Sequence, residues 1–353
     1  MSEQANNGCA AGFGVRLIGC TDDVVLPIGM YDYTEALGCC TLVDKTMFIA
    51  DMLDCDASVL VCCRPEGFGK SMNLSMLKAF LERPAVGRAG RISFADTLIW
   101  GADGGRYRNE YACYPVISLD FSGAARRGAS VVGVVRDALS GECARLMPLL
   151  EAPDLARDKV RHIERVARGV ASEAEVDSAL GLLIELLEIA CDEQVVLLVD
   201  GYDAAWSPSA SARDASGAGP AELLDRVLFD AIATAGHSLR LTCLMGERPG
   251  PAEEALSSRS CSYRLSTPLS TWCDRWFGFS DAEVEALLSH AGREEYLDDA
   301  REWLEGYRFG RTYCSSPARV IGFLGRGCTA PVRADLYGYA DCLSRVVAGW
   351  NLD

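Results

Sequence analysis

A short apolar run followed at once by a glycine-containing loop and an amphipathic helix constrains this chain most. Residues 59–63 are continuously apolar, which predicts a buried strand. From residue 71 to residue 81, apolar side chains recur at helical intervals. The intervening residues 64–71 read Arg-Pro-Glu-Gly-Phe-Gly-Lys-Ser. A strand, a glycine loop and a helix in this order form the local structure that a phosphate-binding loop (P-loop) requires.

The end of this loop carries the residue types that bind phosphate. In a P-loop, backbone N–H groups surround the β-phosphate, the lysine neutralises phosphate oxygens, and the following hydroxyl joins the Mg²⁺ shell. Lys70 and Ser71 supply these two side chains, while Gly67 and Gly69 permit close approach of the backbone. Arg64 stands where the usual first glycine would fall. We prefer a P-loop to the alternative of a helix start with an exposed lysine.

A second apolar run, residues 195–200, ends in a carboxylate. The run has the pattern of a central parallel strand buried on both faces, and ligands bind at the carboxyl ends of such strands. Asp200 is therefore expected to hold Mg²⁺ together with Ser71, as in a Walker B motif. Hydrolysis usually needs a further carboxylate directly after this aspartate, but that residue is Gly201. Asp203 is the nearest catalytic substitute, and a turn aspartate that caps backbone N–H groups is an equal alternative.

These patterns together predict an α/β fold of the P-loop NTPase type. Its mostly parallel sheet is flanked by helices, and a smaller, mainly helical subdomain follows near the C-terminus. Further strands are expected at residues 115–121 and 239–244, and helices at residues 46–53, 130–150, 173–190, 221–235, 281–291 and 294–305. We expect a loose leader at residues 1–23, the P-loop domain at 24–275, with a mobile loop at 207–220, and the helical subdomain at 276–353.

Composition limits the classes of partner. Fifty acidic and 34 basic residues give a formal net charge of −16, which disfavours binding to nucleic acid. The sequence lacks both a secretory signal and an apolar stretch of roughly 20 residues, so we expect a cytoplasmic protein without a membrane span. Its 16 cysteines are scattered and never form a C-x-x-C pair, and only three histidines are present. Structural zinc is therefore disfavoured.

Several short blocks stand in a fixed order over about residues 24–325. They are residues 26–29 (Leu-Pro-Ile-Gly), 43–46 (Val-Asp-Lys-Thr), 64–65 with 68–71, 73–77, 114–117, 200 with 202–204, 277–279 with 283–284, and 306–310 (Gly-Tyr-Arg-Phe-Gly). In this set and order they resemble the AAA-ATPase-like family of bacterial proteins. Members typically carry a P-loop ATPase module followed by a PD-(D/E)XK nuclease-like domain. The resemblance explains Arg64, because the family's loop itself begins Arg-Pro.

The chain departs from the family pattern at the phosphate side of the expected site. Glu66 and Gly67 replace two arginines of the family's loop, which should weaken the affinity for a nucleotide. The family's Asp-Glu-Tyr-Asp reads Asp-Gly-Tyr-Asp at residues 200–203, which makes the Walker B motif degenerate. A Thr-Gly that ends a strand in relatives is Met-Gly at residues 245–246. Too few residues follow about residue 325 for the nuclease-like domain.

Two functions from different classes follow. The first is an ATP-binding P-loop protein with Mg²⁺ as cofactor and weak or uncertain hydrolysis. The second is a degenerate, non-hydrolysing member that acts as a protein-interaction or regulatory module, with a protein partner or self-association. Nucleic-acid processing is a third idea, which the acidity and the missing domain oppose. The residues expected to contact nucleotide or metal are Arg64, Gly67, Phe68, Gly69, Lys70, Ser71 and Asp200, with Asp203 as the catalytic candidate.

Overall fold

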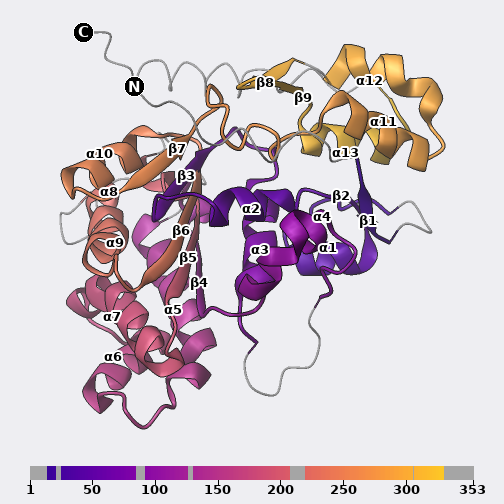
Figure 1. Cartoon of the computed structure of the whole chain (residues 1–353). Helices are drawn as coiled ribbons and strands as arrows, with labels where there is room; N and C mark the ends of the chain where they lie inside the picture. Colours follow the sequence, from indigo (N-terminus) through magenta and orange to yellow (C-terminus); the bar gives the residue numbers. More distant parts are fainter. Residues whose placement is uncertain are drawn as a thin grey trace, which may run out of the picture.

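The core of the fold is a five-stranded sheet in which all strands are parallel (Figure 1). The computed structural model describes residues 14–20, 25–84, 92–125, 130–206, 219–304 and 306–329. The strand order is β4 (Val116–Asp120), β5 (Val195–Asp200), β6 (Leu239–Gly246), β3 (Val59–Cys63) and β7 (Tyr263–Ser266). Every residue of β3 and β5 is buried, which explains their continuous apolar runs. The predicted α/β fold with a parallel sheet is confirmed.

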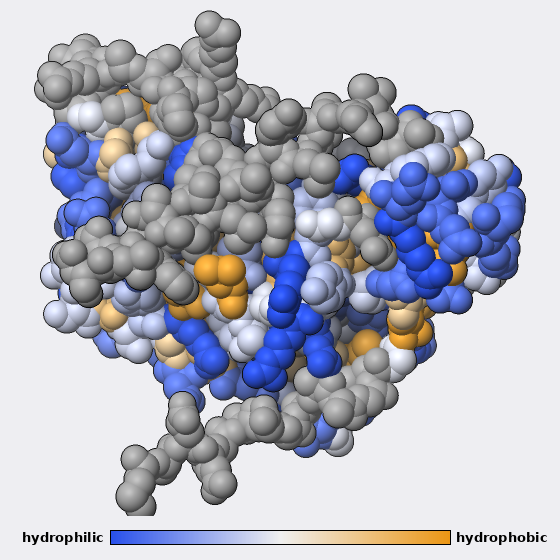
Figure 2. Space-filling view, turned by 90° about the horizontal axis from the view of Figure 1, so that it is seen from above, coloured by the Kyte–Doolittle hydropathy of each residue, from blue (hydrophilic) through white to orange (hydrophobic). Residues whose placement is uncertain are grey.

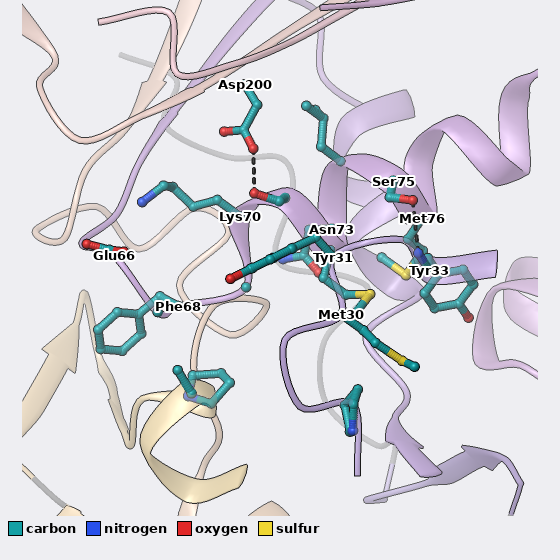
Figure 3. Close-up of a pocket in the computed structure, with 18 of the residues that line it drawn as sticks. Met30, Tyr31, Tyr33, Glu66, Phe68, Lys70, Asn73, Ser75, Met76 and Asp200 are labelled. Carbon is teal, nitrogen blue, oxygen red and sulfur yellow. Dashed lines mark hydrogen bonds between the residues drawn. The ribbon is translucent and has the colours of Figure 1, made fainter. Parts of the chain in front are cut away.

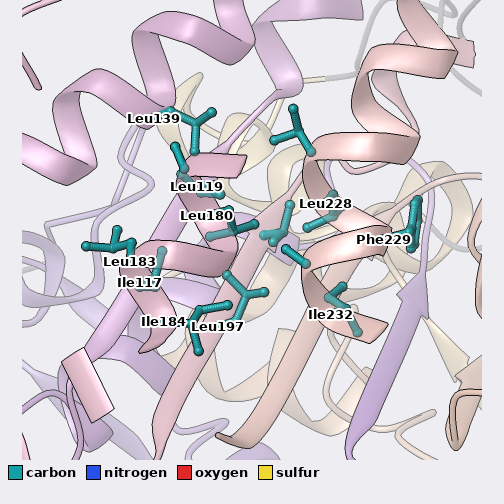
Figure 4. Packing of buried hydrophobic residues seen from close by; sticks show 14 of the residues in the cluster. Ile117, Leu119, Leu139, Leu180, Leu183, Ile184, Leu197, Leu228, Phe229 and Ile232 are labelled. Atoms are coloured by element: carbon teal, nitrogen blue, oxygen red, sulfur yellow. The ribbon is translucent and has the colours of Figure 1, made fainter. Parts of the chain in front are cut away.

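Helices cover both faces of the sheet, and alternate strand residues contact different helices. On one face, Leu139, Leu180 and Leu228 pack against Ile117 and Leu197 of the strands (Figure 4). The helices on this face are α5 (Val131–Leu146), α6 (Arg157–Ala167), α7 (Glu173–Cys191), α8 (Pro220–Leu224), η5 (Asp225–Asp230), α9 (Ala231–Thr234) and α10 (Gly250–Ser258). The opposite face carries α1 (Tyr33–Cys39), α2 (Met47–Leu53), α3 (Lys70–Leu81), α4 (Leu98–Gly101) and η1 (Ala102–Glu110).

Three predicted helices change type within their predicted bounds. The helix predicted over residues 130–150 is α-helical to Leu146 and ends in the 3₁₀ turn η3 (Met147–Leu150). The segment predicted as one helix over residues 221–235 consists of α8, the π-helical η5 and α9 in direct succession. The helix predicted over residues 294–305 begins with the 3₁₀ turn η6 (Glu294–Tyr296) and continues as α12 (Leu297–Leu304). Hydrophobic periodicity identifies such segments, but it does not distinguish hydrogen bonds to the fourth residue from those to the third or fifth.

The C-terminal helices form a separate small core. It joins α11 (Asp281–His290), α12 and α13 (Pro317–Gly325), next to the hairpin of β8 (Tyr307–Phe309) and β9 (Thr312–Cys314). Val43 of β2 (Thr41–Val43) also belongs to this core, so the N-terminal part of the chain contributes to it. Seen from above, the described residues over these helices are mainly hydrophilic (Figure 2). Residues 330–353 of the expected subdomain lie outside the described residues.

The expected leader is partly structured. Residues 17–19 form β1 (Leu17–Gly19), which pairs with β2 in antiparallel register. The sequence did not predict this strand, because three residues are too few to show a periodicity. Residues 1–13 and 21–23, and residues 207–218 of the expected mobile loop, lie outside the described residues. Among the helices that the structure describes, none is both long and apolar enough to cross a membrane.

Candidate functional site

A cleft with a volume of about 990 Å³ opens where the strands of the sheet end. Asp120, Asp200 and Gly246, the last residues of β4, β5 and β6, line it, and so does the loop at residues 66–71. Lys70, Asp200 and Glu66 lie on one side of the cleft, and Met30, Tyr31 and Tyr33 on the other (Figure 3). The site therefore has a charged end and a largely apolar end at the edge of the sheet where α/β proteins bind ligands.

The loop after β3 turns sharply and closes on itself through Lys70. Gly67 and Gly69 have φ angles of +81° and +79°, a left-handed conformation that glycine adopts without steric cost. Lys70 begins α3, and its Nζ donates to the carbonyl oxygens of Arg64 at 2.8 Å and Pro65 at 2.9 Å. The lysine side chain therefore spans the loop from the helix back to its first two residues and fixes the curvature of the backbone.

Lys70 also has an acidic neighbour at the end of β6. An ammonium group has three donors, and the two loop carbonyls use two of them. Oε1 of Glu247 lies 3.7 Å from Nζ, which is within ion-pair distance but beyond a hydrogen bond. Since the Glu247 side chain is 42% exposed, this pair is weak and open to competition. An incoming phosphate would therefore compete with Glu247 for Lys70.

Ser71 and Asp200 come together from two elements. The Ser71 hydroxyl, in the first turn of α3, donates to Oδ2 of Asp200 at the end of β5 over 2.5 Å. Burial raises the pKa of Asp200, and the negative charge of Asp120 raises it further. The hydrogen bond from Ser71 and the positive charge of Lys70 act in the opposite direction and lower this pKa. A hydroxyl and a carboxylate at this distance are oxygen ligands of the kind that Mg²⁺ prefers, so the pair fits this ion.

The Arg64 side chain points away from the cleft, although the sequence placed it among the nucleotide contacts. It is fully buried, with its guanidinium 4.7 Å from the ring centre of Phe277 and 4.9 Å from that of Phe309. It donates to the carbonyl oxygen and the hydroxyl of Ser266, the last residue of β7, at 3.0 Å each. Arg64 therefore joins the sheet to the C-terminal part, and only its carbonyl faces Lys70.

Phe68 anchors the same loop. Its ring is buried, and its centre lies 4.8 Å from the ring centres of both Tyr307 and Phe309 of β8. The carbonyl of Gly67 accepts the Ser316 hydroxyl at 3.0 Å and the N–H of Ala318 at 3.2 Å, at the start of α13. The loop is therefore held between the sheet and the C-terminal helices.

Asp203 is engaged with backbone groups of a neighbouring loop. Its side chain is buried, and its Oδ2 accepts the N–H groups of Arg248 at 2.9 Å and Glu247 at 3.2 Å. Burial raises its pKa, and the two backbone hydrogen bonds lower it. A Cβ atom at Gly246 would lie 2.5 Å from Oδ1 of Asp203, so the glycine makes room for this carboxylate. These contacts give Asp203 a capping arrangement, and the residue also lines the cleft.

Asp120 is a site residue that the sequence did not single out. It ends β4, where its Cα pairs in parallel register with that of Asp200. Its side chain is exposed and lines the cleft, and its Oδ1 accepts the N–H of Ser122 at 2.8 Å. The available signal was a carboxylate one residue before the end of the strand predicted at residues 115–121. The sequence did not give the strand order, which places β4 beside β5 and therefore Asp120 beside Asp200.

The apolar end of the cleft is built by the segment before α1. Residues 26–29, which the sequence marked only as one of the family-like blocks, line this end of the cleft together with residues 30–33. The N–H of Tyr33 donates to the Ser75 hydroxyl at 2.9 Å, and Asp32 caps α1 by accepting the N–H of Glu35. Met30 and Tyr31 lie on this side of the cleft, and the Tyr31 side chain is 70% exposed (Figure 3). Pro317 and Ile321 of α13 also line the cleft.

Comparison with known proteins adds one finding. A family model described as a predicted AAA-ATPase matches residues 27–247, which is more than half of the chain. The match begins at the apolar end of the cleft and includes the loop after β3 and the ends of β4, β5 and β6. Searches of curated proteins and of solved structures gave no match.

Proposed function

Because the chain belongs to the AAA-ATPase-like family of predicted AAA-ATPases, we propose that it binds ATP or a related purine nucleoside triphosphate, with Mg²⁺, in this cleft. The observation that carries the proposal is the convergence of Lys70, Ser71 and Asp200 at the carboxyl edge of the sheet. A lysine-closed loop before a helix, beside a hydroxyl and a carboxylate, is the arrangement with which P-loop proteins hold a triphosphate.

Each residue has a definite part in this site. Lys70 would bind phosphate oxygens in place of Glu247, and the backbone at Gly67 and Gly69 would approach the phosphates closely. Ser71 and Asp200 would hold Mg²⁺, which neutralises phosphate charge when bound. The purine would lie at the apolar end, where Tyr31 is exposed for stacking. Phe68 and Arg64 would act through the position of the loop, because both side chains are buried.

We propose that hydrolysis is weak. Asp203, the catalytic candidate from sequence, accepts two backbone N–H groups and has little freedom to orient a water molecule. Position 201 carries no carboxylate. Since a positioned acid–base group contributes about 10²–10⁴-fold to a rate, the loss of the usual glutamate alone makes turnover slow.

The alternative is a non-hydrolysing member that acts as an interaction or regulatory module. The acidic residues Glu66 and Glu247 at the phosphate end favour it, because they oppose the charge of a triphosphate. For either function we propose a cytoplasmic protein with a P-loop domain at residues 24–275 and a helical subdomain at 276–353. The small core that joins α11, α12 and α13 supports a C-terminal subdomain, which shares Val43 with the N-terminal part. The net charge of −16 supports a mononucleotide rather than a nucleic acid as ligand.

Calorimetric titration of Mg²⁺-ATP into the protein and its Lys70→Ala variant tests the proposal. Hydrogen bonds to charged groups contribute about 1.5–3 kcal/mol, so we expect the variant to bind roughly 10- to 150-fold more weakly. Lys159→Ala is the matched control, because Lys159 lies on α6 and makes a surface ion pair with Glu185. Equal affinity of the Lys70 and Lys159 variants, or no binding to the unmodified protein at millimolar ATP, would refute nucleotide binding at this loop.

A further inference from the structure

The backbone around Gly201 excludes a side chain at the position where the family carries its glutamate. Gly201 has a φ of +67°, and a Cβ atom there would lie 2.5 Å from the N atom and 2.7 Å from the Cα of Ser122. Both are backbone atoms of the segment that follows β4, so no rotation of a side chain relieves the overlap. The close approach of the chains after β4 and β5 therefore leaves no room for a side chain at the position directly after Asp200.

The same approach brings the carboxylate of β4 to the site. Asp120 and Asp200 are register partners on adjacent parallel strands, whose backbones lie about 4.8 Å apart. The Asp120 side chain is exposed in the cleft and held by the N–H of Ser122, the residue that closes position 201. A carboxylate here is within one water molecule of a group bound beside Asp200.

The other acids of the cleft have different engagements. Asp32 caps α1, Asp203 accepts two backbone N–H groups, and Glu247 pairs with Lys70. Glu66 lies on the loop itself, on the side that binds phosphate oxygens. Asp120 is the acid that a strand end fixes in position beside Asp200, and it is not engaged with the phosphate-binding lysine.

We propose that Asp120 is a catalytic residue that orients and deprotonates the water attacking the terminal phosphate. This inference rests on the proposed nucleotide binding. The water oxygen forms a bond to the γ-phosphorus, and the bond from that phosphorus to the β–γ bridging oxygen breaks with its electron pair remaining on the nucleoside diphosphate. Asp120 accepts the proton of the water and passes it to the solvent. Hydrolysis thus depends on β4 rather than on the residue after Asp200.

The test compares Asp120→Asn with Asp137→Asn, a control in which an exposed aspartate on α5 changes in the same way. Asparagine retains an Oδ1 acceptor for the N–H of Ser122, so the turn after β4 persists. Phosphate release is measured at saturating Mg²⁺-ATP. Calorimetry gives the affinities for Mg²⁺-ATP and for Mg²⁺-ADP with aluminium fluoride, which imitates the transition state.

We expect Asp120→Asn to lower kcat about 10²-fold or more. Its affinity for Mg²⁺-ATP should stay within threefold of the unmodified protein, and its affinity for the aluminium fluoride complex should fall at least tenfold. Asp120→Glu should restore part of the turnover. A kcat within threefold of the Asp137→Asn control would overturn the inference, as would an equal loss of affinity for Mg²⁺-ATP and the transition-state complex.

Failure of this inference is distinguishable from failure of nucleotide binding. If the unmodified protein binds Mg²⁺-ATP in a Lys70-dependent way but releases no phosphate, Asp120 has no catalytic role and the binding proposal stands. If Mg²⁺-ATP does not bind at all, both are refuted.

Discussion

The two halves of the proposed phosphate end differ in how closely they match the site of an NTPase. In the half proposed to bind phosphate and metal, called the binding half, Lys70 is bonded to the loop backbone and Ser71 to Asp200. The half that would activate water has a glycine at position 201 and an aspartate at 203 that is bonded to backbone. The first half is held by the loop and α3, and the second by the packing of β4 against β5. Backbone packing can therefore exclude a carboxylate from one position of a site and leave the neighbouring groups in place.

The largest effect is expected from returning the family's glutamate to position 201. Gly201→Glu combines a positive φ with a Cβ 2.5 Å from backbone, so it should lower the free energy of unfolding by roughly 3 kcal/mol or more and leave turnover unrestored. Urea unfolding measures the stability, and phosphate release measures the turnover. Gly250→Glu is the control, because Gly250 is exposed on α10 with open space at its Cβ position. A stable, faster Gly201→Glu protein would contradict the steric explanation.

A smaller effect, on the affinity for Mg²⁺-ATP, is expected from changing Glu247, the acidic neighbour of Lys70. Glu247→Gln keeps the size of the side chain and removes the anion 3.7 Å from Nζ. Exposed ion pairs contribute about 0.2–1 kcal/mol, and the variant also loses a repulsion of the incoming phosphate, so affinity for Mg²⁺-ATP should rise about three- to tenfold. The rise should be smaller for Mg²⁺-ADP, which lacks the terminal phosphate. Glu254→Gln on α10 removes the same charge elsewhere, and an equal gain there would show that only net charge matters.

The positions of Lys70, Ser71 and Asp200 were predictable from the sequence because each follows from a local pattern. A continuous apolar strand, a glycine loop and a helix are contiguous in residues 59–81, and Asp200 ends an equally apolar strand. The loop's conformation depends on Gly67, Gly69 and Lys70, all within seven residues of its start. Local sequence therefore contains both the identity of these groups and most of their geometry.

The remaining features depend on contacts between distant residues. Arg64 donates hydrogen bonds to Ser266 of β7, which is 202 positions away. β7 is hard to predict from sequence, because it is a four-residue edge strand with only one buried residue. The need for glycine at 201 arises from Ser122 on another segment. The role inferred for Asp120 follows from the order β4-β5 in the sheet. Periodicity along one segment carries no information about which segment lies beside it.

The smallest expected effect concerns the pH dependence of metal binding, which tests the link between the two halves through Asp200. Burial is the largest cause that raises the pKa of Asp200, and the neighbouring Asp120 raises it further. Because the pKa is raised in the folded state, the proton on Asp200 stabilises the fold at low pH, and this stabilisation is lost as pH rises through the raised pKa. Mg²⁺ needs the deprotonated carboxylate, so metal-dependent binding has the opposite trend and weakens as pH falls.

We therefore expect the enhancement of ATP affinity by Mg²⁺ to weaken as pH falls through the raised pKa of Asp200, beyond the change caused by the nucleotide itself. Asp200→Asn isolates the protein's contribution, because the nucleotide titrates identically in both titrations. Asp120→Asn should shift the pH midpoint of the remaining dependence downward, since it removes the neighbouring negative charge that raises the pKa of Asp200. An unchanged midpoint in this variant would mean that the ends of β4 and β5 act independently, and that the water-activating half does not influence the metal-binding half through charge.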